Sequence, residues 1–193
     1  MFLIDDGEAI STVTYVEDFA KGVLGLFLNE KAYNEDFNVV SDFHYSHKEI
    51  LEKLFRKIGV APNIINIPRE TIAKYLPNYA EMVLGDRALN AIFDNSKLKK
   101  AIPGLHFEYN LEKGLDKVLQ YYESNYKYSL IDYKYDGQID YLLKKHSNIS
   151  RNYYKYNNIK GFITYSIFSI IPIKIMIKCQ NFIKKMKSII KKK

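Results

Sequence analysis

The sequence contains very little cysteine and no leader-like N-terminal segment. Cys179 is the single cysteine among 193 residues, so no internal disulfide can form. Residues 1–20 lack a basic segment followed by an apolar stretch and a small-residue cleavage site, which is the pattern of a secretory leader. We therefore expect a cytoplasmic protein.

Acidic residues are absent from residues 141–193. This segment holds 13 basic side chains, whereas residues 1–140 hold the other 16 basic residues and all 22 acidic ones. The formal charges are +13 for the tail and −6 for the body, which together give the net charge of +7. An anionic partner is therefore expected to meet the tail and not the body.

Apolar runs long enough to span a bilayer are also lacking. The run at residues 162–173 has twelve residues, against about 20 needed to span, and Pro172 and Lys174 interrupt it. From Ile175 to Ile190, apolar residues recur on one helical face and lysines fill the other. A basic amphipathic tail over 161–193 is predicted. Residues 162–193 of this tail are suited to binding an anionic membrane surface, which would place the protein at the inner face of the membrane. The alternative is that the tail packs on the body or on a partner.

The body shows alternating strand and helix signals. Strands are predicted at three short segments rich in β-branched or apolar residues: 11–16, 36–40 and 63–67. Helices are predicted after them and further along the chain: 17–28, 47–58 with a Ser46–Glu49 capping box, one after Pro68, one capped by Asp94, Asn95 or Ser96, and 110–125. This order predicts an α/β fold with a parallel sheet. Three strands make that sheet incomplete, since such sheets usually have about five or six.

Five segments of the body occur in the order found in one enzyme family. They are Thr14-Tyr15-Val16-Glu17-Asp18-Phe19-Ala20, Glu35-Asp36-Phe37-Asn38-Val39, Gly85-Asp86, Phe93-Asp94-Asn95-Ser96-Lys97 and Leu111-Glu112-Lys113-Gly114-Leu115. Together they resemble the C-terminal part of the NAD-dependent epimerase/dehydratase family, the extended short-chain dehydrogenases that modify nucleotide-sugars.

The resemblance implies a fold, a division of the chain and a substrate class. It implies an incomplete parallel sheet with a helical substrate subdomain over residues 1–125, followed by a Tyr/Lys-rich linker at 126–160 and the tail. The parent family binds NAD(P) in an N-terminal Rossmann half that this sequence lacks. This chain would then be the nucleotide-sugar-binding portion of such an enzyme of polysaccharide biosynthesis, working with a separate Rossmann half or by self-association.

The resemblance also assigns substrate-binding residues. Asp86 matches the aspartate that helps to hold the nucleotide, and Arg87 beside it supplies a cation. Val16 and Asp18 match the corner between strand and helix near the substrate pocket. Ser11 stands where many epimerases place a phosphate-binding arginine, which favours a substrate other than UDP-galactose.

The cofactor site and the catalytic pair of that family are missing. Gly22-Val23-Leu24-Gly25 is the nearest approach to a dinucleotide-binding turn, but it lies inside a predicted helix, which indicates close helix packing. Tyrosine is followed four residues later by lysine at Tyr109, Tyr141 and Tyr156, no more often than chance produces in a sequence with 17 tyrosines. We therefore expect no catalytic residue in this chain and no NAD(P) bound to it alone.

Two other groups of residues have simpler interpretations. Asp42, His44 and His47 could bind a metal, but their spacing favours helix capping, so no metal is expected. The tyrosines between Tyr121 and Tyr156 could stack on bases, but the stretch carries aspartates and no nucleic-acid-binding motif. The alternative to the substrate-binding function is therefore a non-catalytic module that binds a membrane surface or a partner through the tail.

Overall fold

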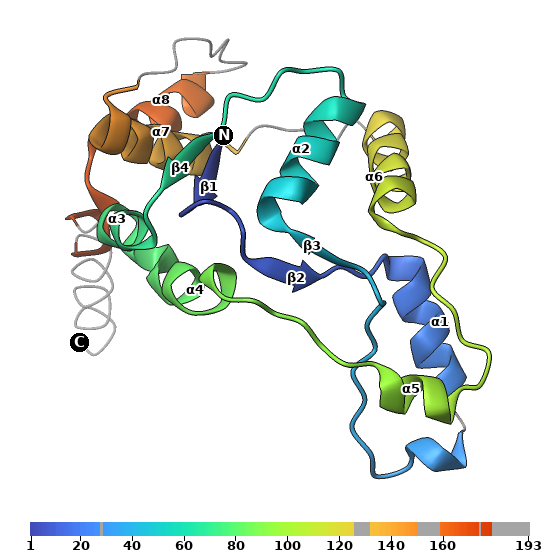
Figure 1. Ribbon diagram of the computed structural model, residues 1–193. Helices are drawn as coiled ribbons and strands as arrows, with labels where there is room; N and C mark the ends of the chain where they lie inside the picture. The colour runs from blue at the N-terminus through green and yellow to red at the C-terminus, as the bar shows by residue number, and fades with distance from the viewer. Residues whose placement is uncertain (28, 126–131, 150–158, 174, 179–193) are drawn as a thin grey trace, which may run out of the picture. The chain divides into compact units, whose positions relative to one another are not determined.

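The computed structural model describes residues 1–27, 29–125, 132–149, 159–173 and 175–178. The fold is α/β and mostly helical (Figure 1). Two compact units divide the chain: unit 1 comprises residues 1–66 and 86–129, and unit 2 comprises residues 67–85 and 130–193. This division differs from the predicted boundaries at 125 and 160, because residues 67–85 of the predicted body belong with the later helices.

The strands of the fold are all three residues long. Strands β1 (Phe2–Ile4) and β4 (Ile65–Ile67) form a small parallel sheet. Strands β2 (Ile10–Thr12) and β3 (His44–Ser46) pair antiparallel, with Thr12 opposite His44. On its other edge, β2 makes a single parallel bridge from Ser11 to Ala91. The strands predicted at 11–16 and 63–67 are therefore present but shorter.

The strand predicted at 36–40 is not formed, and the prediction of a wholly parallel sheet is wrong at the β2–β3 pair. Side-chain hydrogen bonds replace the expected ladder after Val40. The Ser41 backbone N–H donates to Thr14 Oγ1 at 2.8 Å, and Ser41 Oγ donates to the Val13 carbonyl at 2.6 Å. Serine and threonine often satisfy the backbone in this way where a regular ladder does not continue.

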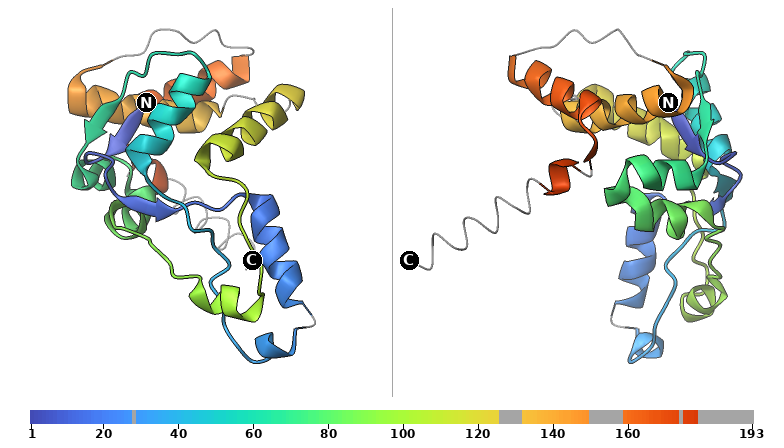
Figure 2. Two further views of the ribbon diagram at one scale, coloured as in Figure 1. Left: turned by 45° about the vertical axis from the view of Figure 1, so that its right-hand side comes forward. Right: turned by 90° about the vertical axis from the view of Figure 1, so that its left-hand side faces the viewer.

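The described part of unit 1 also contains α-helices. They are α1 (Val16–Leu26), α2 (His47–Lys57), α5 (Ser96–Ala101) and α6 (Leu111–Ser124). Short 3₁₀ helices lie at Glu30–Ala32 and Asp86–Ala88. The predicted capping box is confirmed, since Ser46 Oγ accepts from Glu49 N–H and the Glu49 carboxylate accepts from Ser46 N–H. Helices α2 and α6 lie side by side (Figures 1 and 2) and are joined by the Lys57–Asp116 ion pair at 2.5 Å.

Helix α1 packs closely through its glycines. A Cβ at Gly22 would lie 2.6 Å from Val39 Cγ1, and one at Gly25 would lie 2.7 Å from Ile102 Cδ1. Both contacts are far shorter than van der Waals distance. The packing interpretation of the Gly22–Gly25 segment is therefore confirmed.

Unit 2 is helical. It contains the end of β4, α3 (Arg69–Tyr75), a 3₁₀ turn (Pro77–Tyr79), α4 (Ala80–Leu84), α7 (Tyr133–Ser147) and α8 (Ile159–Ile170). Helices α7 and α8 lie side by side in both figures, and their backbones approach at Gly137, where a Cβ would lie 2.8 Å from the Tyr165 carbonyl oxygen.

Helix α7 lies within the segment 126–160, for which a Tyr/Lys-rich linker is predicted. Seven consecutive residues of α7 are buried, from Gly137 to Leu143, and Leu142 and Leu143 belong to the core of unit 2. Lysines and tyrosines are interleaved with these apolar residues, so the sequence shows no apolar helical face here. The other parts of the segment, 126–131 and 150–158, lie outside the described residues.

The predicted amphipathic tail is described only in part. Helix α8 covers most of the apolar run, residues 175–178 are helical, and residues 179–193 lie outside the described part. Among the described helices, none has the length and apolar character needed to cross a membrane.

Candidate functional site

Two histidines contact neighbouring residues of strand β2 in unit 1. Thr12 Oγ1 lies 3.1 Å from His44 Nδ1, and Ser11 Oγ lies 3.2 Å from His47 Nε2. Successive side chains of a strand point to opposite faces, so Ser11 and Thr12 direct these contacts to opposite sides. His44 and His47 are therefore separated by the sheet that they both contact.

A pocket lies beside His44. It has a volume of about 370 Å³ and is open to solvent. We call it the Asp42 pocket, and it is lined by Ser41, Asp42, His44, Ile92, Phe93, Asp94 and Asn95. Its walls come from the segment that leads into β3, from β3 itself and from the segment that leads into α5. The volume is near the lower end of the range for small-molecule sites, about 300–1,000 Å³, so it suits one ring-sized group.

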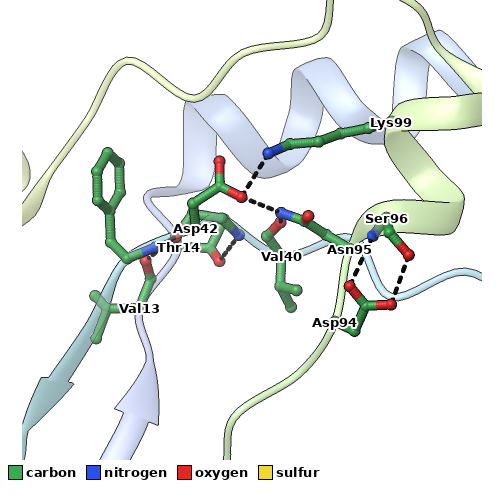
Figure 3. Close-up of polar contacts among 10 residues, drawn as sticks. Val13, Thr14, Val40, Asp42, Asp94, Asn95, Ser96 and Lys99 are labelled. Atoms are coloured by element: carbon green, nitrogen blue, oxygen red, sulfur yellow. Dashed lines mark hydrogen bonds and ion pairs between the residues drawn. The ribbon is translucent and has the colours of Figure 1, made fainter.

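Asp42 is held from one side only (Figure 3). Its Oδ1 accepts from Lys99 Nζ at 2.5 Å and from Asn95 Nδ2 at 3.1 Å. The hydrogen bond from Lys99 is the largest cause of the lowered pKa of the Asp42 carboxyl, and the Asn95 bond adds to it. Oδ2 makes no hydrogen bond with any described residue. Asp42 therefore presents an ionised oxygen that can accept from a ligand.

Asn95 and Asp94 build the frame of this site. The buried Asn95 amide also donates to the Val40 carbonyl at 2.9 Å, which fixes its orientation toward Asp42. Asp94 uses one oxygen to accept from the Ser96 N–H at 3.1 Å and the other to accept from Ser96 Oγ at 2.6 Å (Figure 3). These bonds lower the Asp94 pKa and hold the start of α5, as predicted for this position.

His44, Ile92 and Phe93 complete the lining of the pocket. His44 uses Nδ1 toward Thr12, and its Nε2 has no hydrogen bond within the described part of the chain. His44 also contributes to the lowered pKa of Asp42, so the two groups are close enough to interact. Ile92 and Phe93 are both about half exposed and supply apolar surface. A carboxylate, an imidazole nitrogen and an aromatic face are together suited to a ring that carries hydroxyl groups.

Asp86 and Arg87 lie elsewhere in unit 1. They belong to the 3₁₀ helix Asp86–Ala88, and Arg87 Nε lies 3.5 Å from Asp86 Oδ2. The pKa of His47 is lowered first by burial and then by the charge of Arg87, and Asp86 opposes this effect. The structure therefore brings these two predicted residues toward His47, and neither lines the Asp42 pocket.

Val16 and Asp18 are also outside the pocket lining. Val16 is the first residue of α1 and its side chain is largely exposed. Asp18 is fully buried, and its Oδ2 accepts from the Tyr109 N–H at 2.9 Å. This geometry gives Asp18 the role of tying α1 to the segment before α6, with no surface left for a ligand.

The other groups considered in the sequence also have definite positions. The metal alternative would need Asp42, His44 and His47 together, but His47 faces Ser11, and the described residues contain no group of three ligating side chains. Helix α2 is capped by Ser46, not by Asp42.

Two of the three tyrosine and lysine pairs lie in the described residues, and in both the pKa of the phenol is raised. Burial raises the pKa of Tyr141, although Lys145 Nζ lies 5.7 Å from its ring centre. Tyr109 donates to Glu17 at 2.6 Å, which raises its pKa as well. Catalysis of the epimerase type needs a phenol pKa shifted in the opposite direction. Tyr156 lies outside the described residues.

Comparisons with known proteins give no relative for this chain. No protein-family model matches it, and neither the curated proteins nor the solved structures contain a significant match. The interpretation of the Asp42 pocket therefore depends on its own geometry.

Proposed function

We propose that unit 1 binds a nucleotide-sugar and holds its sugar ring in the Asp42 pocket. In this proposal the chain is the substrate-binding portion of a protein related to the NAD-dependent epimerases and dehydratases. The observation that carries it is the Asp42 carboxylate, which Lys99 holds through Oδ1 and which lines a pocket of about 370 Å³ together with His44 and Phe93.

The chemistry of the lining fits a sugar better than a phosphate. Asp42 and Asp94 are ionised because their pKa values are lowered, so they repel an anion and accept hydrogen bonds from hydroxyl groups. An apolar ring face can pack on Phe93. The volume suits one ring, so the nucleotide must lie outside the pocket. Arg87, which the resemblance links to the substrate, lies toward His47 on the other side of β2, so this proposal does not place the phosphates there.

Titration calorimetry of the whole chain tests this proposal. The ligands are free monosaccharides, a panel of UDP-, GDP- and dTDP-sugars, and NADH. Asp42→Asn removes a charged acceptor worth about 1.5–3 kcal/mol, which is expected to weaken sugar binding about 10–100-fold. Asp116→Asn is the matched control, since that carboxylate also pairs with a lysine at 2.5 Å but lies between α2 and α6.

The outcomes test whether the sugar occupies the Asp42 pocket. Unchanged sugar binding in Asp42→Asn, or equal loss in Asp116→Asn, would contradict the pocket assignment, as would the absence of any sugar binding. Arg87→Gln should leave the binding of free monosaccharides and of nucleotide-sugars unchanged, because Arg87 lies toward His47 and outside the pocket lining. Loss of nucleotide-sugar binding in Arg87→Gln would place the substrate beside His47 and would contradict the pocket assignment.

A further inference from the structure

Helix α8 of unit 2 exposes a row of isoleucines. Ile163, Ile167 and Ile170 follow the spacing i, i+4 and i+7, which places them on one face of the helix. They are exposed, with 51% of Ile163 and 70% of Ile170 accessible, and two further exposed isoleucines, Ile171 and Ile175, follow the end of α8. We call these five residues the isoleucine face.

The other side of α8 is already used for packing. The Tyr165 carbonyl oxygen and Phe168 Cβ lie 2.8 and 2.9 Å from the position of a Cβ on Gly137, so α8 meets the α7 backbone there. Tyr165 also donates to the buried Asp140 of α7. The isoleucine face is therefore an additional apolar surface beyond the one that builds the core of unit 2.

The charge around this face indicates what covers it. Residues 141–193 carry 13 basic side chains and no acidic one. Lys160 and Lys178, near the two ends of the face, are both exposed. A second copy of the chain would bring two such segments, each with a charge of +13, together, which opposes association. Anionic lipid headgroups attract the lysines while the acyl region accepts the isoleucines.

We infer that unit 2 attaches this protein to an anionic membrane surface, with the isoleucine face of α8 inserted and the surrounding lysines on the headgroups. The helix then lies in the plane of the interface, because no described helix is long and apolar enough to cross. This attachment is separate from the sugar pocket and does not depend on it.

Vesicle flotation of the whole chain tests the inference. Vesicles of phosphatidylcholine with 30% phosphatidylglycerol are compared with pure phosphatidylcholine at low and high salt. We expect at least tenfold stronger binding to the anionic vesicles at low salt, and weaker binding at high salt. Ile167→Asn with Ile170→Asn should reduce binding at least tenfold.

A matched control uses exposed apolar residues of unit 1. Leu24 and Phe27 are 70% and 72% exposed, at α1 and its end, so Leu24→Asn with Phe27→Asn removes similar apolar area. The control should bind vesicles like the unmodified chain, and circular dichroism checks that both double variants are folded. If the α8 variant is unfolded, Lys160→Gln with Lys178→Gln replaces it, and its binding should fall at low salt.

Three results would overturn the inference. The first is the absence of binding to anionic vesicles. The second is equal binding of the two double variants. The third is self-association, measured by sedimentation, that the α8 variant abolishes while vesicle binding is unchanged, which would assign the isoleucine face to a second copy. Asp42→Asn should retain vesicle binding, so failure of the sugar proposal is distinguishable from failure of this one.

Discussion

Alanine substitutions at helical glycines should have opposite effects in α1 and α6. In an exposed helix, Gly→Ala stabilises by about 1 kcal/mol because alanine has the higher helix propensity. At Gly22 the new Cβ would lie 2.6 Å from Val39 Cγ1, a contact that real Cβ atoms do not make. At Gly114 of α6 the nearest atom is Tyr15 Cδ2 at 3.7 Å, an ordinary van der Waals distance.

The expected magnitudes follow from these distances. Overpacking costs about 1–3 kcal/mol, and the stiff β-branched Val39 cannot easily turn its methyl groups away. Gly22→Ala should therefore lower the free energy of unfolding by about 1 kcal/mol after the propensity gain is subtracted. Gly114→Ala should raise it by up to about 1 kcal/mol. Gly25→Ala should fall between them, since its closest neighbour is the movable end of the Ile102 side chain.

Urea unfolding followed by circular dichroism measures these differences. Because the chain has two units, amide hydrogen exchange of α1 should accompany it, so that the change is assigned to unit 1. Stabilisation by Gly22→Ala equal to that by Gly114→Ala would refute the packing argument. The segment would then need another explanation for its two glycines.

Three further effects follow from the hydrogen bonds of unit 1. Ser46→Ala should lower the free energy of unfolding by about 1 kcal/mol in urea titrations, because it removes the cap of α2. Asp18→Ala should cost about 1–3 kcal/mol, since it leaves the Tyr109 N–H without its acceptor, and loss of amide protection at Tyr109 would report it. Lys99 lowers the Asp42 pKa, so the pair stabilises the fold above the unfolded pKa of about 4 and less as pH falls through the folded value. Because both side chains are exposed, Lys99→Gln should remove no more than about 1 kcal/mol of this pH-dependent stability, measured by urea unfolding between pH 2 and 7.

Local signals in the sequence predicted the parts of the fold that local interactions determine. The Ser46–Glu49 capping box and the start of α6 at Asn110 are formed as expected, because each requires only neighbours within one helical turn. The prediction of a strand at 36–40 is wrong because local propensity does not include contacts with distant residues. β propensity describes the segment alone, whereas its hydrogen bonds depend on Ser41 meeting Val13 and Thr14 from another part of the chain.

Helix α7 was missed because it lacks the pattern that sequence analysis depends on. A surface helix shows apolar residues on one face, but α7 is buried on every side from Gly137 to Leu143. Gln138 and Asp140 are buried along with Leu142, so polar and apolar residues alternate without helical periodicity. Tertiary partners in unit 2, such as the Tyr165 hydroxyl on Asp140, make this burial possible.

The candidate site shows why spacing in a sequence does not by itself define a cluster. His44 and His47 are three residues apart, which would place them on one face if they shared a helix. The boundary between β3 and α2 falls between them, at the helix cap Ser46, and they contact different residues of β2. Asp42 instead meets Lys99, which is 57 residues away. The partner that makes Asp42 an ionised ligand group is therefore supplied by tertiary packing, and no pattern of neighbouring residues could have identified it.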